Sequence, residues 1–181
     1  MKLLFLIPFL CLISCSVKTG ANQIVDSYQY FDCQNNTVLT TKTEEVLVLK
    51  AKELRTCFLE NNDKIVWISS YWQGCSSQDI VKQKTFFEKY KDKLVFVIVS
   101  ETFDIKEVKE IEGKINYPIF FIDPTYNNSR LKNSSEYMKD VLKENTTDEA
   151  LKHTSVFVKN GKVLKVAYNA DLTEDFFRSL F

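Results

Sequence analysis

Residues 65–76 read IVWISSYWQGCS, and they join the clearest strand signal of the chain to the start of a helix. From Lys64 to Ser70, four consecutive apolar residues predict a strand that is buried on both faces. From Ser76 to Tyr90 the spacing predicts a helix, since Phe86 precedes Tyr90 by four residues on one apolar face. A buried strand, a short loop and a helix in succession are the building unit of an α/β sheet.

The same patterns alternate through the rest of the chain. Successive strand–helix crossovers predict parallel strands, and two alternating runs around Asn160-Gly161 predict an antiparallel hairpin. The residues Asp171-Leu172-Thr173-Glu174 resemble a capping box with Asp171 as the cap, which predicts a closing helix. We therefore expect an α/β protein with a mixed β-sheet flanked by helices. The remaining strands are expected at 94–99, 117–122, 155–158 and 163–168, and the remaining helices at 104–114 and 137–143.

The composition excludes several classes of protein. The chain has 181 residues, about one domain's worth, with 45% hydrophobic and 27% charged residues, which excludes a disordered chain. Its 24 basic and 24 acidic residues balance, so no nucleic-acid partner is expected. With a single His, a His-rich metal site is excluded, and no metal or other cofactor is expected.

The first sixteen residues, MKLLFLIPFLCLISCS, have the layout of a targeting segment. Lys2 precedes an apolar run from Leu3 to Ile13, which is too short to span a bilayer. The ending Leu12-Ile13-Ser14-Cys15 resembles the lipobox of bacterial lipoproteins. This resemblance implies cleavage after Ser14 and a lipid on Cys15. An ordinary secretory signal, in which Cys15 is incidental, is the alternative.

The lipoprotein resemblance divides the chain into a signal peptide (1–14), a lipidated Cys15 with a tether and an uncertain first strand (15–44), and a domain (45–181). It implies a protein of the bacterial cell envelope, facing the periplasm and bound to the membrane through Cys15. Within the same resemblance, the non-acidic Ser16 favours the outer over the inner membrane. A eukaryotic secreted protein is the competing context, with sequons that start at Asn35, Asn127, Asn133 and Asn145.

Three stretches of residues 45–181 together resemble the thioredoxin-like fold. Residues 65–76 look like the family's buried strand and the loop that carries its pair of Cys. Asn116 to Asp123 is similar to the inserted strand of the membrane-tethered, TlpA-like branch, which includes lipoproteins. His153 to Val163 resembles the family's cis-Pro-Thr strand and its Lys-Asn-Gly hairpin. The resemblance implies a thioredoxin-like mixed sheet flanked by helices.

The active-site motif of this resemblance is degenerate. The family's chemistry needs two Cys separated by two residues, of which one attacks a disulfide and the other resolves the mixed disulfide. The Cys positions are 11, 15, 33, 57 and 75, so no such pair exists in any alignment. Without gaps, Gln73 and Ser76 replace the two Cys, whereas a short insertion places Cys75 at the first of them. His153 stands where the family has its cis-Pro.

The loop from Tyr71 to Ser77, together with His153, is the predicted functional face. The leading hypothesis is that it binds a protein or peptide. Tyr71 and Trp72 are candidates for an exposed aromatic patch, and the alternative is that Trp72 packs beneath the loop, as the resemblance implies. The alternative is a thiol–disulfide redox protein in which Cys75, at a helix N-terminus, is the catalytic thiolate. A structural lipoprotein without chemistry is a third hypothesis, so enzymatic activity stays undecided. The predicted binding residues are Tyr71, Trp72, Gln73, Gly74, Ser76 and His153.

Three Cys remain in the mature chain once Cys15 carries a lipid, so at least one of them is unpaired within the monomer. Cys33 and Cys57 are candidates for a structural disulfide, because the predicted compartment is oxidising. The pairing among Cys33, Cys57 and Cys75 does not follow from the sequence.

Overall fold

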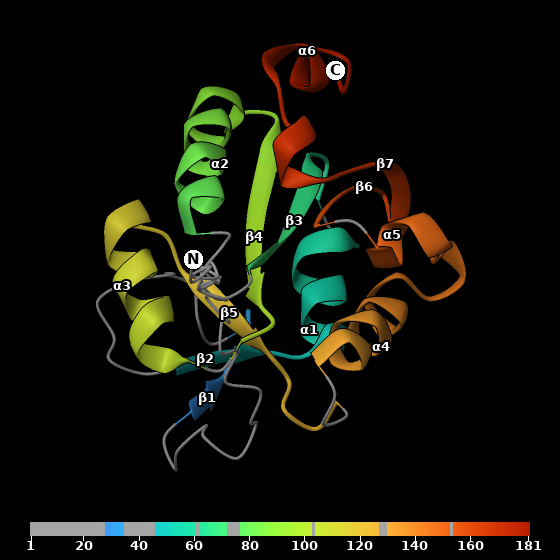
Figure 1. Ribbon diagram of the computed structural model, residues 1–181. Coiled ribbons are helices and arrows are strands. Elements are labelled where there is room, and N and C mark those ends of the chain that lie inside the picture. The colour runs from blue at the N-terminus through green and yellow to red at the C-terminus, as the bar shows by residue number, and fades with distance from the viewer. Residues whose placement is uncertain are drawn as a thin grey trace, which may run out of the picture.

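The described residues form one seven-stranded mixed sheet (Figure 1). In this computed structural model they are residues 28–34, 46–60, 62–71, 77–102, 104–126, 130–152 and 154–181. Across the sheet, the strands lie in the order β1 (Tyr28–Tyr30), β2 (Val46–Leu49), β5 (Ile119–Ile122), β4 (Leu94–Ser100), β3 (Ile65–Tyr71), β6 (Ser155–Lys159) and β7 (Lys162–Ala167). The five strands from β1 to β3 run parallel, whereas β6 and β7 are antiparallel to their neighbours.

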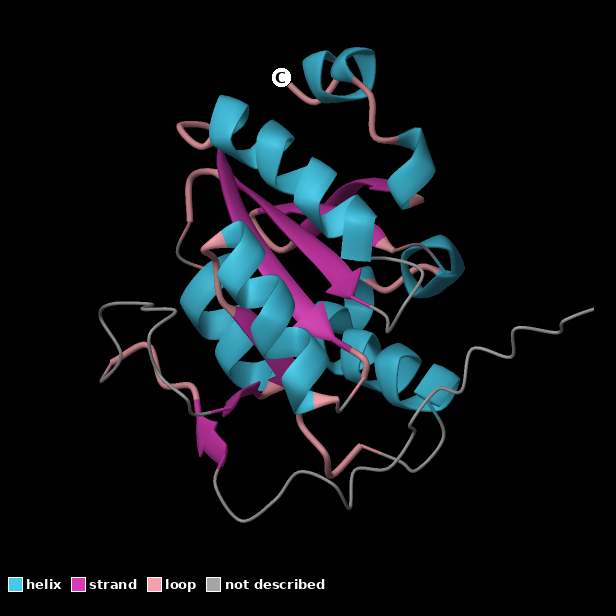
Figure 2. Ribbon diagram, turned by 60° about the vertical axis from the view of Figure 1, so that its left-hand side comes forward, coloured by secondary structure: helices cyan, strands magenta, loops and turns pink. Residues whose placement is uncertain are grey.

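Helices cover both faces of the sheet (Figures 1 and 2). One face carries α2 (Ser77–Tyr90), α3 (Ile105–Ile115) and α6 (Glu174–Arg178). The other carries α1 (Ala51–Leu54), which continues into a π-helical turn, η2 (Arg55–Leu59), and α4 (Arg130–Leu142) with α5 (Asp148–Lys152) beside it. Two short 3-10 turns complete the list, η3 (Lys143–Asn145) and η4 (Asn169–Asp171). The predicted α/β class, with a mixed sheet flanked by helices, is confirmed.

The predicted hairpin is present and has the turn that its sequence requires. Asn160 and Gly161 alone separate β6 from β7, and both adopt positive φ angles, 51° and 74°. A two-residue turn with both central φ angles positive matches the twist of the flanking strands, and Asn-Gly is its preferred sequence.

The start of α4 and the cap of α6 differ from the prediction. The helix expected at 137–143 spans 130–142, because its first turns carry few apolar residues and give no periodic signal. The cap of α6 is Thr173 rather than Asp171, which lies in η4. The Thr173 hydroxyl accepts a hydrogen bond from the Phe176 N–H at 3.2 Å, which satisfies one of the free donors at the start of the helix.

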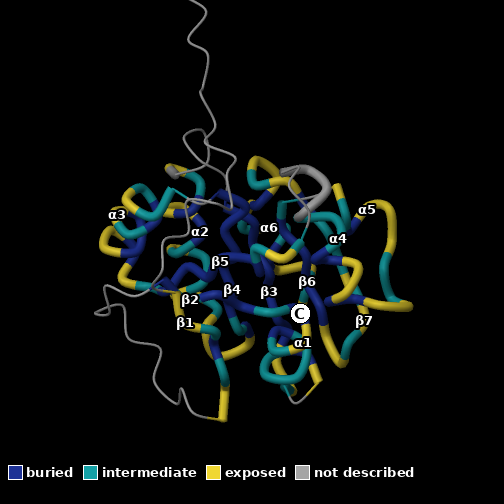
Figure 3. The backbone as a smooth tube through the Cα atoms, turned by 90° about the horizontal axis from the view of Figure 1, so that it is seen from below, coloured by how far each residue is buried: buried dark blue, intermediate teal, exposed yellow. Residues whose placement is uncertain are grey.

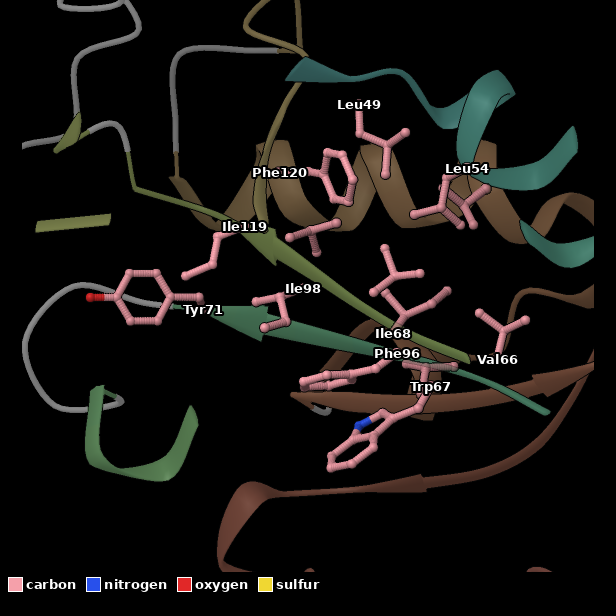
Figure 4. Close-up of a cluster of buried hydrophobic side chains, with 14 of the residues drawn as sticks. Leu49, Leu54, Val66, Trp67, Ile68, Tyr71, Phe96, Ile98, Ile119 and Phe120 are labelled. Carbon is pink, nitrogen blue, oxygen red and sulfur yellow. The ribbon is translucent and has the colours of Figure 1, made fainter. Parts of the chain in front are cut away.

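The core lies on both sides of β3, whose seven residues are all buried (Figures 3 and 4). Trp67 points to one side, where its ring lies 4.5 Å from Phe96 and 5.2 Å from Phe177, centroid to centroid. The alternation of side chains along a strand places Trp67, Ser69 and Tyr71 on the face covered by α2, α3 and α6. Tyr71, the predicted binding residue that lies in β3, is therefore on this face.

Candidate functional site

The described residues that flank the two parts of the predicted face lie at the carboxyl end of β3. Tyr71 is the last residue of β3 and Ser77 is the first residue of α2. Within β3, the Ser70 N–H donates to the carbonyl of Thr154, the residue before the neighbouring strand β6, at 2.8 Å. The described residues next to the loop and next to His153 therefore lie side by side. The other predicted residues, Trp72, Gln73, Gly74, Cys75, Ser76 and His153, and the predicted lipidation site Cys15, lie outside the described residues.

Tyr71 is fully buried, so the prediction of an exposed aromatic ring at this position is wrong. Its hydroxyl donates to a carboxylate oxygen of Glu107 on α3, at 2.6 Å (Figure 4 shows the ring). Burial, followed by the hydrogen bond to Glu107 and its negative charge, raises the pKa of Tyr71 far above its usual range. Tyr71 therefore anchors the carboxyl end of β3 to α3.

A network of buried and partly buried polar side chains holds the same end of the sheet together. Ser69 donates to the Gln83 side-chain carbonyl at 2.6 Å, and the Gln83 amide donates to Asn169 Oδ1 at 2.7 Å. The Thr154 hydroxyl donates to the same oxygen at 2.8 Å and accepts from the Asn169 N–H at 3.0 Å. These bonds connect β3, α2, η4 and the start of β6, which are the elements that border the predicted face.

Trp67 extends this network into the apolar core. Its indole N–H donates to the Ser155 hydroxyl at 3.0 Å, and both side chains are fully buried. An indole N–H that is buried needs such an acceptor, since leaving it unpaired costs about 1–3 kcal/mol. The Ser155 hydroxyl also lies 3.4 Å from Asn169 Oδ1. Ser155 therefore connects the aromatic core around Trp67 to the polar network.

The network is made of hydroxyl, amide and indole groups, none of which titrates near neutral pH. It is suited to fixing backbone positions by hydrogen bonds and not to proton transfer. Within the described residues, no three Asp, Glu, His or Cys side chains converge in an arrangement that could hold a metal ion.

Sequence reasoning missed Gln83 and Asn169. They are 86 residues apart in the chain and meet only in the folded protein. A single signal was available for Gln83: it is a polar residue three positions after the buried Ile80 and four before Phe87, on the apolar side of α2. For Asn169, in a short loop segment, the sequence offers no comparable signal.

Cys33 and Cys57 form a disulfide, one of the pairings that the sequence left open. Their Cα atoms are 5.8 Å apart and 24 residues separate them along the chain. In the loop-closure model, a cross-link of this span stabilises the fold by about 3.5 kcal/mol. The bond fastens the segment that contains β1 to η2, on the opposite face of the sheet from α2.

The segment predicted as a signal peptide, residues 1–14, also lies outside the described residues. Among the helices that the structure describes, none combines the length and hydrophobicity needed to cross a bilayer.

Comparisons with known proteins add little to this picture. No protein-family model matches the chain, and no curated protein matches it. Among solved structures, the chain is similar to a solution structure of a thioredoxin-like protein in its oxidised form. The two share 14% sequence identity with a TM-score of 0.46, over 72% of this chain and 82% of that one.

Proposed function

We propose that the protein is a thioredoxin-like envelope protein that has lost dithiol exchange and binds a protein or peptide at the carboxyl end of β3. The observation that carries this proposal is the absence from the sequence of any two Cys separated by two residues. Without a resolving thiol at that spacing, a mixed disulfide at the loop has no internal route to resolution. A protein that keeps such a fold without the dithiol retains a use for the surface around it.

The buried network supports a role in recognition. Asn169 joins α2 and the start of β6 through hydrogen bonds of 2.7 and 2.8 Å to Gln83 and Thr154. A rigid frame on both sides of a loop reduces the conformational entropy that is lost on binding. The partner would contact residues Trp72 to Ser76 and His153. Tyr71 would position the start of the loop through its hydrogen bond to Glu107.

The proposal also includes a lipid anchor on Cys15, which would hold the domain at the membrane of the bacterial envelope, facing the periplasm. The lipobox-like ending Leu12-Ile13-Ser14-Cys15 supports it. Metabolic labelling with palmitate should mark the wild-type chain and leave a Cys15→Ser variant unlabelled. Equal labelling of the two would contradict the anchor.

Site-specific photo-crosslinking in the envelope of living cells tests the binding face. A photoreactive phenylalanine analogue at position 72 should form a discrete crosslinked product. The same analogue at Leu164, which is 49% exposed on the edge strand β7, is the matched control and should not. No product at position 72, or the same product at both positions, would contradict a binding face at the loop.

A second candidate function, exchange through the single thiol of Cys75, is favoured by one observation. Cys75 precedes the first residue of α2 by two positions in the sequence, and nucleophilic cysteines often lie at helix N-termini. Reduction of insulin by the protein, abolished in Cys75→Ser, would establish this function and overturn the first one. We expect no such turnover.

A further inference from the structure

The N-terminal edge of the sheet is held by few contacts. β1 has three residues and pairs with β2 at three positions, and both Tyr28 and Gln29 are exposed. Phe31 is the main anchor: its N–H donates to the Val48 carbonyl at 2.8 Å and its ring is buried. The ring packs against Phe58 and Phe120, with centroid distances of 5.8 and 5.1 Å.

The Cys33–Cys57 disulfide fastens this edge strand to the body of the protein, and its two sulfurs differ in environment. Cys33 is exposed and lies in a turn two residues after Phe31. Cys57 is partly buried, packs against the apolar core and is the middle residue of the π-helical turn η2. π-helical turns are rare and occur often at functional sites. Because Cys33 is more exposed than Cys57, an attacking thiolate has better access to Cys33.

We propose that the Cys33–Cys57 disulfide is a site of thiol–disulfide exchange for an external protein dithiol, which attacks Cys33. The partner thiolate forms a mixed disulfide with Cys33 Sγ as the Cys33–Cys57 bond breaks, and Cys57 leaves as a thiolate that takes up a proton. The partner's second thiol, once deprotonated, attacks the partner's sulfur in the mixed disulfide. Cys33 then leaves as a thiolate that takes up a proton. In total, the partner loses two electrons and two protons and becomes a disulfide, and this protein gains two thiols.

Exchange at this site would release the edge strand. With the disulfide open, residues 28–34 keep the three-position pairing with β2, the anchor at Phe31 and the Lys50 ammonium 3.9 Å from the centre of the Tyr30 ring. Local opening is easiest where backbone pairing is short and exposed. Reduction would thus expose the edge of β2 while leaving β3, at the centre of the sheet, intact. This inference does not use the loop from Tyr71 to Ser77 and stands apart from the proposed function.

A trapping experiment on the oxidised full-length chain tests which sulfur is attacked. The probe is a thioredoxin whose resolving Cys is replaced by Ser, so that the mixed disulfide accumulates and peptide mass spectrometry can locate it. We expect the adduct on Cys33 to exceed that on Cys57 by about ten-fold or more. An adduct mainly on Cys57 would overturn the proposal. So would no adduct at either Cys while the same probe forms one with insulin.

Hydrogen exchange tests the consequence for the edge strand. After reduction by wild-type thioredoxin, the peptide that contains Phe31 should exchange about ten-fold faster or more, while peptides from β3 keep their protection. A Cys75→Ser variant should behave in the same way, because the released strand does not involve that thiol. Loss of protection in β3 as well, or unchanged protection at Phe31, would mean that the disulfide is purely structural and would overturn the proposal.

Discussion

Replacing Tyr71 by Phe removes one buried hydroxyl and leaves the ring in place. In the wild-type protein this hydroxyl donates to Glu107 at 2.6 Å. A hydrogen bond to a charged group contributes about 1.5–3 kcal/mol to stability. Because Glu107 is partly exposed and can regain water, Tyr71→Phe should lower the free energy of unfolding by about 2 kcal/mol. For a chain of this size, that free energy corresponds to a fall in melting temperature of about 4–8 °C.

Tyr137→Phe is the matched control. The Tyr137 hydroxyl is fully buried and has no hydrogen-bond partner among the described residues. Burial also raises the pKa of Tyr137 well above its usual value. Removing a buried hydroxyl that is already unpaired costs no hydrogen bond, so the variant should be neutral or more stable by up to about 1 kcal/mol.

Urea unfolding of the full-length variants, followed through the fluorescence of the buried Trp67, measures both free energies. The two substitutions are chemically identical, so the difference between them isolates the hydrogen bond to Glu107. Equal losses in Tyr71→Phe and Tyr137→Phe, or a larger loss in Tyr137→Phe, would refute the assignment of Tyr71 as the anchor between β3 and α3.

Three further changes test local features. Thr173→Ala should destabilise the protein by about 1 kcal/mol and Asp171→Ala by much less, since the hydroxyl of Thr173 caps α6; urea unfolding of both variants would contradict this cap if Asp171→Ala cost more. Gly161→Ala should destabilise the protein by about 1–2 kcal/mol, because Gly161 has a φ of 74° that a residue with a Cβ adopts only with strain. A clash does not contribute, since an added Cβ meets nothing within 4 Å. No loss of stability in urea would contradict a positive-φ turn. Burial, followed by the charge of Glu88, raises the pKa of Tyr117 to about 12. This tyrosine ionises near pH 10 in the unfolded chain, so its contribution is complete below pH 10 and is lost as the pH rises toward 12. Unfolding free energies at pH 9, 10 and 11 should therefore fall with pH, and less steeply in Tyr117→Phe; parallel curves would contradict this prediction.

The parts of the fold that repeat a simple pattern could be predicted from the sequence. The four apolar residues within Lys64–Ser70 correspond to β3 at 65–71, and the run from Leu94 corresponds to β4 at 94–100. Both strands are buried on two faces, so continuous hydrophobicity identifies them. The turn at Asn160-Gly161 follows from local backbone preference, which does not depend on the rest of the protein.

The parts that depend on long-range contacts could not be predicted. The helical segment 51–59 is too short for a periodic signal, and its π-helical turn places Cys57 opposite a Cys 24 residues earlier. From the sequence, an aromatic residue at the end of a strand, such as Tyr71, can be either exposed or buried. Its burial depends on α3, which supplies Glu107 as the partner of its hydroxyl. Likewise, the buried Gln83 amide donates to Asn169, which is 86 residues away in the chain.

Whether the loop after β3 binds a partner without performing thiol chemistry can be measured through the pH dependence of alkylation at Cys75. Peptide mass spectrometry on the full-length chain would follow labelling at this residue by itself. We expect slow labelling with a midpoint near the ordinary thiol pKa of about 8.5. Rapid labelling with a midpoint well below about 8.5 would show an activated thiolate and would contradict the proposed binding role in favour of single-thiol exchange.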